Sequence, residues 1–220
     1  MKLKGKETKV LVLEQFRQWP ERAYTAYCFF YKAHQQEILQ LPFDDYMEMQ
    51  YYFLRALYET GDFTILHREA SIFLEELIQH QEFTKEHKSV YCKTIELIAL
   101  AEQNCMQQNR AIELNKSLVK MGNAPKRIQK RLFWLLFQRN YSQGKTGMAM
   151  VMIFLLLSLV VNALIVFCIG PFYGERLIGA EMIRNTIFGL GILNFLLLQS
   201  LYARRAYLEI KKLRPADRQA

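Results

Sequence analysis

Apolar residues recur every three or four positions through most of the first 122 residues, which predicts a series of amphipathic helices. No stretch alternates with period two for long enough to suggest a strand. Turn and cap residues separate the helices: Pro42 ends one, Asp44 or Asp45 can cap the next, Gly61 ends it and Asp62 can cap another. The expected helices cover residues 7–19, 20–41, 44–60, 62–78, 84–105 and 111–121. The fold class is therefore all-α, with antiparallel helices joined by short turns.

Two later segments have a different pattern, because residues 147–169 and 185–203 contain no charged side chain. Residues 148–169 would make a helix of about 33 Å, which is close to the thickness of the hydrocarbon core of a bilayer. The second segment, 186–203, is shorter and includes Asn194, Gln199 and Ser200. We expect a C-terminal transmembrane hairpin with a short external loop. The predicted organisation is a helical domain over 1–122, a basic amphipathic juxtamembrane helix and linker over 123–146, the hairpin over 147–203 and a basic tail over 204–220.

Charge predicts how this hairpin is oriented. The formal net charge is +8, and it is concentrated in residues 126–146 (+6) and 204–220 (+4), whereas residues 170–185 are neutral. Both basic stretches flank the same side of the hairpin, so the positive-inside rule predicts that the N- and C-termini are cytoplasmic, in a cell (inner) membrane. Residues 10–13 are too short an apolar core for a signal peptide, which agrees with this orientation. Basic clusters at membrane borders favour a bilayer with anionic headgroups as the partner, and not a nucleic acid.

The juxtamembrane segment carries a candidate membrane-surface site. Its basic and aromatic members are Lys126, Arg127, Lys130, Arg131 and Trp134. This composition is typical of a helix that lies in the membrane interface. The alternative is a last helix that closes the soluble domain, and one helix can do both.

Small and amide residues in the two spans suggest how the spans pack. Gly189 and Gly191 provide a small-residue face on the second span, with Asn194 one turn away. Counted from the outer ends of the spans, Asn162 and Asn194 are both about 10 to 12 Å deep. An amide in hydrocarbon needs a partner. We therefore expect the two asparagines to hydrogen-bond across the hairpin or between copies in an oligomer; the alternative is that each bonds to a backbone carbonyl or meets a partner subunit singly.

The residues 56–63, Ala-Leu-Tyr-Glu-Thr-Gly-Asp-Phe, resemble the inter-helix turn of a tetratricopeptide (TPR-like) repeat. Gly61, Asp62 and Phe63 match the turn, and Leu57 and Tyr58 match the end of the first helix. Leu54, Leu66 and Ile78 depart from the family pattern. A second copy, with its turn near residues 104–109, would lack the glycine. The resemblance covers about 35 residues and implies a concave protein-binding surface, to which Tyr51, Tyr58 and Phe63 would contribute. A plain helical bundle is the alternative.

Candidate chemistry is sparse. The four histidines are scattered, the four cysteines form no CxxC pair, and no GxSxG, phosphate loop or HExxH is present. We expect no enzyme activity, no metal site and no cofactor. The prediction is a membrane-anchored helical scaffold, adaptor or accessory subunit that binds a protein partner through its cytoplasmic domain. The alternative is an oligomerising membrane effector or channel-like subunit with a cytoplasmic sensor domain.

Overall fold

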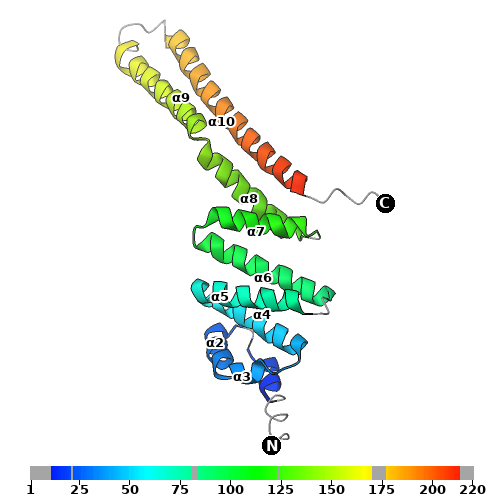
Figure 1. The fold of residues 1–220 in the computed structure, drawn as a ribbon. Helices are drawn as coiled ribbons and strands as arrows, with labels where there is room; N and C mark the ends of the chain where they lie inside the picture. Colours follow the sequence, from blue (N-terminus) through cyan, green and yellow to red (C-terminus); the bar gives the residue numbers. More distant parts are fainter. Residues whose placement is uncertain (1–10, 21, 81–83, 123, 170–176, 214–220) are drawn as a thin grey trace, which may run out of the picture. The chain divides into compact units, whose positions relative to one another are not determined.

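The computed structural model describes residues 11–20, 22–80, 84–122, 124–169 and 177–213, and these are almost entirely helical, without a strand (Figure 1). After a short helical stretch at residues 11–17, the helices are α2 (Tyr24–Ala33), α3 (Gln35–Ile38), α4 (Phe43–Thr60), α5 (Phe63–Gln79), α6 (Lys85–Asn104), α7 (Gln108–Lys120), α8 (Lys126–Gln143), α9 (Lys145–Leu164) and α10 (Leu177–Leu213). A π-helical turn, η1 (Ile165–Ile169), continues α9. The predicted all-α class is confirmed.

Two local predictions are wrong, and a third is confirmed only in part. The single helix expected over 20–41 is divided at His34, whose φ of −109° and ψ of 18° interrupt it between α2 and α3. Asp44 and Asp45 do not cap α4, because Pro42 holds the N-cap position and the two acids lie in the first turn. Asp62 does hold the N-cap position of α5, but its side chain makes no capping hydrogen bond.

The chain divides into two compact units, residues 1–118 and 119–220. In the first unit α4 is the central helix and packs against α2, α5 and α6. Its core is dominated by large side chains that are almost completely buried, among them Tyr27, Met49, Leu54, Leu57, Leu66, Phe73 and Leu77. Phe53 stacks on Tyr31, with 4.0 Å between the ring centroids. These contacts bury the apolar faces that the sequence pattern predicts.

Helices α4, α5 and α6 pack as stacked hairpins do. The helix α4 contacts α5, α5 contacts α6, and α4 also contacts α6 directly. An all-helical unit with these contacts is consistent with a helical repeat-like domain.

The turn between α4 and α5 depends on Gly61. Its φ is +83°, and the Asp62 N–H donates to the Leu57 carbonyl across it. The end of α6 has the same geometry without glycine: Met106 has a φ of +60°, and the Gln107 N–H donates to the Glu102 carbonyl. A left-handed backbone conformation is readily adopted by glycine, whereas it is costly for methionine because of its Cβ atom. The two turns are related in backbone geometry and differ in sequence.

In the second unit, one long helix pairs with two shorter ones. The 37-residue α10 packs against both α9 and α8. At about 1.5 Å per residue it is about 55 Å long, which exceeds the hydrocarbon thickness of a bilayer. The span expected over 186–203 is therefore the middle of a longer helix. The C-terminal part of this helix continues beyond the N-terminal end of α9 and runs alongside α8.

Candidate membrane and partner-binding sites

Two helices are long and apolar enough to cross a membrane, over Ala149–Cys168 and Glu181–Leu213. They are largely exposed within the second unit: Leu159, Phe167 and Met182 have 66%, 75% and 72% of their surface accessible. A continuous apolar surface of this size is rare on a protein surrounded by water. It is the surface expected of helices that contact lipid.

The hairpin has a defined register. Four pairs of residues lie opposite each other: Gly144 and Tyr202, Gly147 and Leu198, Phe154 and Gly191, and Asn162 and Arg184. Each step forward along α9 is thus matched by an equal step back along α10. The less exposed positions along α9 and the start of η1 include Gly147, Val151, Phe154, Ser158, Val161 and Ile165. Their alternating four- and three-residue spacing is that of an antiparallel coiled-coil contact.

The pairing of Asn162 with Asn194 across the hairpin is wrong, and their pairing between copies stays a prediction. Asn162 Oδ1 accepts a hydrogen bond of 3.1 Å from Arg184 Nη1. In the observed register Asn194 lies opposite residues 151 and 152, about 15 Å along the axis from Asn162. The expectation failed because it started the second span at Thr186, whereas α10 begins at Leu177.

The two candidate packing glycines differ in environment. A Cβ atom built on Gly191 would lie 3.2 Å from the Phe154 Cβ, which is a tight contact between α9 and α10. Nothing lies within 4 Å of the corresponding position on Gly189. Gly144, which the sequence analysis did not single out, tolerates a side chain least, because an added Cβ would collide with the Tyr202 ring. The Tyr202 hydroxyl also donates to the Gly144 carbonyl over 3.4 Å.

The helix α8, which was predicted to lie next to the membrane, continues the pairing along α10. Its Ile128, Leu132, Leu135 and Leu136 are buried. Lys126, Arg127, Lys130 and Trp134 are exposed, and Arg131 is half-buried. At 1.5 Å per residue the basic residues lie about 20 to 27 Å from Gly144 along the helix. Of the α8 aromatics, Tyr141 is nearest to the apolar span.

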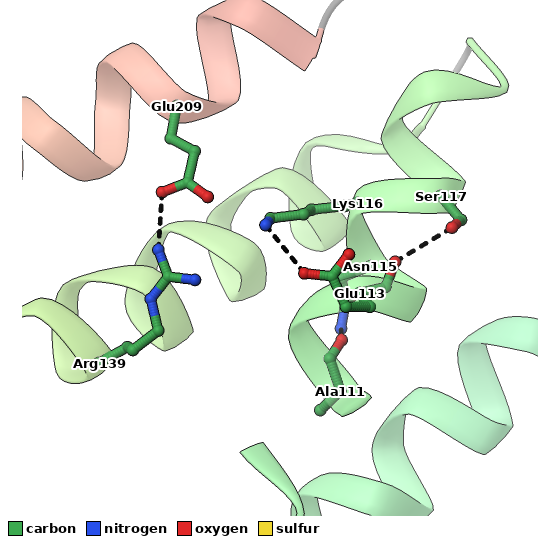
Figure 2. A network of polar contacts seen from close by, with 7 residues as sticks. All are labelled: Ala111, Glu113, Asn115, Lys116, Ser117, Arg139 and Glu209. Atoms are coloured by element: carbon green, nitrogen blue, oxygen red, sulfur yellow. Dashed lines mark hydrogen bonds and ion pairs between the residues drawn. The ribbon is translucent and has the colours of Figure 1, made fainter. Parts of the chain in front are cut away.

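One ion pair joins α8 to the end of α10. Arg139 Nη2 lies 2.8 Å from Glu209 Oε2, and both side chains are about 70% buried. Figure 2 shows the two side chains pointing toward each other from their helices. In the same view, Lys116 and Ser117 of α7 bond to Glu113, and Asn115 Nδ2 donates to the Ala111 carbonyl. The Arg139–Glu209 pair holds α10 beside α8 beyond the apolar span, at residues whose partnership the sequence could not reveal.

An open hollow of about 360 Å³ lies on the α8–α10 surface. It is lined by Trp134, Phe137, Gln138 and Tyr141 of α8 and by Gln199 of α10. The aromatic rings contact one another in series, and Tyr141 meets the Tyr202 ring edge-on at 6.3 Å between centroids. Aromatic rings with polar edges suit the headgroup level of a membrane.

In the first unit, the exposed face of α4 is bordered by two cation–π contacts. Lys93 of α6 lies 5.8 Å from the centre of the Tyr51 ring, and Arg55 of α4 lies 5.9 Å from the centre of the Tyr24 ring on α2. Tyr52 packs beside them, 6.3 Å from Tyr24. We define Tyr24, Tyr51, Tyr52, Arg55 and Lys93 as the α4 surface. Tyrosine and arginine are the residue types enriched where proteins bind each other.

Tyr58 and Phe63 lie elsewhere. Their rings contact each other across the α4–α5 turn at 6.0 Å, and Asn104 Nδ2 donates to the Tyr58 hydroxyl over 3.3 Å. Both side chains are half-buried and hold the turn against α6. Of the three residues predicted to bind a partner, Tyr51 alone belongs to the α4 surface.

A polar cluster holds the start of α6 against α4. The Thr84 hydroxyl accepts from the His87 N–H, and the Thr84 N–H donates to His87 Nδ1, forming a capping box. His87 Nε2 lies 3.1 Å from Asp44 Oδ1, and the imidazole is 3% exposed. His80 stacks on Phe43 and meets His87 edge-on. The cluster explains Asp44 as a contact to α6 and not as a helix cap.

Several titratable groups in this unit are desolvated. Burial raises the pKa of Tyr27, Tyr31 and Tyr46, and the hydrogen bond from the Tyr46 hydroxyl to Glu76 raises the pKa of Tyr46 further. Burial also raises the pKa of the Cys28 and Cys92 thiols, so both stay protonated at neutral pH. Within the described ranges, no group of three or more His, Cys, Asp or Glu side chains could hold a metal ion.

Comparisons of the chain with protein-family models, with curated proteins and with solved structures find no match. The sites are therefore defined by their own geometry. Sequence reasoning missed Arg55, Lys93 and Arg184. A basic residue four positions after Tyr51 was the visible signal for Arg55, and an arginine close to an apolar segment was the signal for Arg184.

Proposed function

We propose that the chain is a two-pass membrane protein whose N-terminal helical unit holds a protein partner at the membrane. The observation that supports this most directly is the exposed apolar surface of α9 and α10, in the same chain as a helical unit with a well-packed core of its own. Lipid would cover the hairpin, and the helical unit would remain in water.

The hairpin geometry bears on the orientation. Because α9 and α10 are antiparallel, α8 and the C-terminal part of α10 lie at the same end of the hairpin. In the sequence, the basic stretches 126–146 and 204–220 adjoin the two segments at that end, and the neutral stretch 170–185 connects the segments at the other. The positive-inside rule then favours cytoplasmic N- and C-termini.

The partner would bind the α4 surface. In a TPR-like arrangement of hairpins, the first helices of successive hairpins line the concave face. With α4 and α6 in those positions, the contact between Tyr51 and Lys93 joins the two first helices. Rigid tyrosines with adjacent basic groups provide a large contact area at a low cost in side-chain entropy.

Labelling tests the membrane arrangement. In a full-length chain without native cysteines, Gly174→Cys should react with an impermeant thiol reagent on intact cells, whereas Ala220→Cys should react only after the cells are opened. The chain should stay in the membrane fraction through an alkaline wash. Labelling of both positions on intact cells, or the reverse pattern, would contradict the proposed orientation.

A matched pair of variants tests the partner surface. Proteins cross-linked to the full-length chain in membranes should include one that is lost with Tyr51→Ala and with Lys93→Glu. Lys88→Glu is the control, because it makes the same charge change on the opposite side of α6. The same protein should be lost when residues 1–118 are removed. A cross-linked partner that all four chains retain would argue that binding resides in the hairpin.

A further inference from the structure

Two charged residues of α10 lie within the apolar length of α9. Arg184 is opposite Asn162, which is seven residues before the outer end of η1, so its Cα is about 10 Å inside that end. Glu181 lies one turn nearer to the outer border. If α9 crosses the bilayer, as the proposed function requires, the Cα atoms of both charged residues lie within the outer leaflet. Ionisable groups at this depth need partners.

The guanidinium of Arg184 is held by two amides. Nη1 donates to Asn162 Oδ1 over 3.1 Å, and Nε and Nη2 donate to Asn185 Oδ1 over 3.2 and 3.1 Å. An arginine has five N–H donors, so two remain after these three bonds. Among the residues that the structure describes, no carboxylate forms an ion pair with it. The described residues orient this positive charge, but none of their carboxylates neutralises it.

Glu181 is in the complementary situation. It lies three residues before Arg184, yet it makes no ion pair or hydrogen bond with the described part of the chain. Within the described ranges, Arg184 has no acidic partner and Glu181 has no basic partner, although the two lie one turn apart on one helix.

Glu181 shares a face of α10 with exposed apolar residues, and Arg184 lies at the edge of this face, next to α9. Glu181, Asn185, Phe188 and Ile192 follow at four- and three-residue spacing, which places them on one side of the helix. Asn185 holds the guanidinium toward this side. Phe188 and Ile192 are 47% and 45% exposed, so α9 does not cover the face.

We propose that copies of this chain associate side by side through this face of α10, with Glu181 of each copy paired to Arg184 of the other. Copies inserted in the same direction are parallel, so residues of equal number lie at equal depth. Glu181 and Arg184 then differ in depth by about 4.5 Å, which an arginine side chain can bridge. A two-fold axis along the membrane normal gives two equivalent ion pairs. Phe188 and Ile192 pack beneath them.

Charge exchange between copies tests the pairing. Two full-length chains with different tags are produced together, solubilised from membranes in mild detergent and captured by one tag, and the other tag is quantified. Wild-type copies are expected to co-purify. Glu181→Arg in both copies, or Arg184→Glu in both, should reduce co-purification about tenfold, since each combination brings like charges together. The neutral variants E181Q and R184Q should also reduce it. Lys211→Glu, at the far end of α10, is the control and should have no effect.

The decisive combination is one copy with E181R and the other with R184E. One copy then carries two bases and the other two acids, so pairs can form between chains and not within either chain. Co-purification restored to at least half of the wild-type value supports the proposal. Co-purification of E181Q or R184Q copies at the wild-type level, or no restoration in the mixed pair, overturns it; the latter would indicate an acid in the same chain or a lipid phosphate as the partner.

The same samples separate this inference from the proposed function. A wild-type chain that stays in the membrane fraction without co-purifying overturns the association alone. A chain that an alkaline wash releases from the membrane overturns both.

Discussion

The two units of the chain use apolar residues in opposite ways. In residues 1–118, aromatic and aliphatic side chains converge on α4, and Tyr27, Leu54 and Phe73 have no accessible surface. In the α9–α10 hairpin a narrow stripe is covered, while Leu156, Leu159 and Phe167 remain more than half exposed. Water drives apolar groups together in the first unit, and in the proposed membrane arrangement lipid would remove that driving force in the second. The hairpin instead depends on close contact, as at Gly191, and on hydrogen bonds, as at Asn162.

The register of the hairpin gives the largest expected effect. In a full-length chain without native cysteines, Gly147→Cys with Leu198→Cys should form an intramolecular disulfide nearly completely on oxidation in membranes, because the two positions are in contact. Asn162→Cys with Asn194→Cys should form none, since about 15 Å of helix separates their levels. The reverse result would restore the pairing that the sequence suggested.

Core packing in the first unit should give the next largest effect. Phe73→Ala should lower the free energy of unfolding by about 3 to 5 kcal/mol, because it empties a fully enclosed site. Chemical denaturation of a chain ending at Gly122, followed by circular dichroism, measures this. Phe29→Ala is the matched control: Phe29 is 70% exposed, so its loss should cost under about 0.5 kcal/mol. Equal effects at the two positions would mean that Phe73 is not in the core.

Close packing in the hairpin should be sensitive at one glycine and not at the other. Even a Cβ atom added at Gly191 would lie only 3.2 Å from the Phe154 side chain, so the bulkier Gly191→Val should destabilise the hairpin by about 1 to 3 kcal/mol. Gly189→Val has the same helix propensity change in open space and should cost less. Reversible unfolding in detergent, with the disulfide yield at 147 and 198 as a second measure, compares them. A larger effect at Gly189 would indicate that α10 is rotated from its observed position.

Alkaline pH should weaken the first unit through its tyrosines. The pKa of Tyr46 is raised in the folded state, so above the ordinary tyrosine pKa of about 10 the unfolded chain loses a proton that the folded chain keeps. Stability is then fully present below about pH 10 and falls as pH rises, by at most about 1.4 kcal/mol per unit for one tyrosine. Tyr46→Phe should reduce this slope in pH-dependent denaturation of the chain ending at Gly122. An unchanged slope above pH 10 would show that Tyr46 ionises freely in the folded protein.

The two helix-ending turns should give the smallest effects, of opposite sign. Met106→Gly should stabilise the first unit by about 0.5 to 1 kcal/mol, because Met106 has a positive φ and its side chain is 84% exposed. Gly61→Ala should destabilise by a similar amount. Denaturation midpoints of the chain ending at Gly122 measure both. Destabilisation by Met106→Gly would mean that the methionine side chain contributes more than its exposure suggests.

Sequence reasoning predicted well where structure depends on near neighbours. Three- and four-residue spacing predicted most of the helices, Gly61 ended α4 as expected, and the charge-free windows indicated the two apolar helices. It failed where a distant group decided the outcome. Asp44 looked like a cap because aspartate is among the preferred N-cap residues, but His87, more than forty residues away, is its partner.

The apolar windows were sufficient to indicate a hairpin, because spanning length and the absence of charge are local properties of the chain. The level at which its two helices pair was decided by tertiary contacts. The Tyr202 ring packs directly against Gly144, and Phe154 packs directly against Gly191. Arg139 forms an ion pair with Glu209, which lies 70 positions later in the sequence. Together they set a register that brings Arg184 to Asn162. Sequence spacing measures distance along one helix, whereas register depends on which side chains of two helices fit together, and that information exists only when both helices are present.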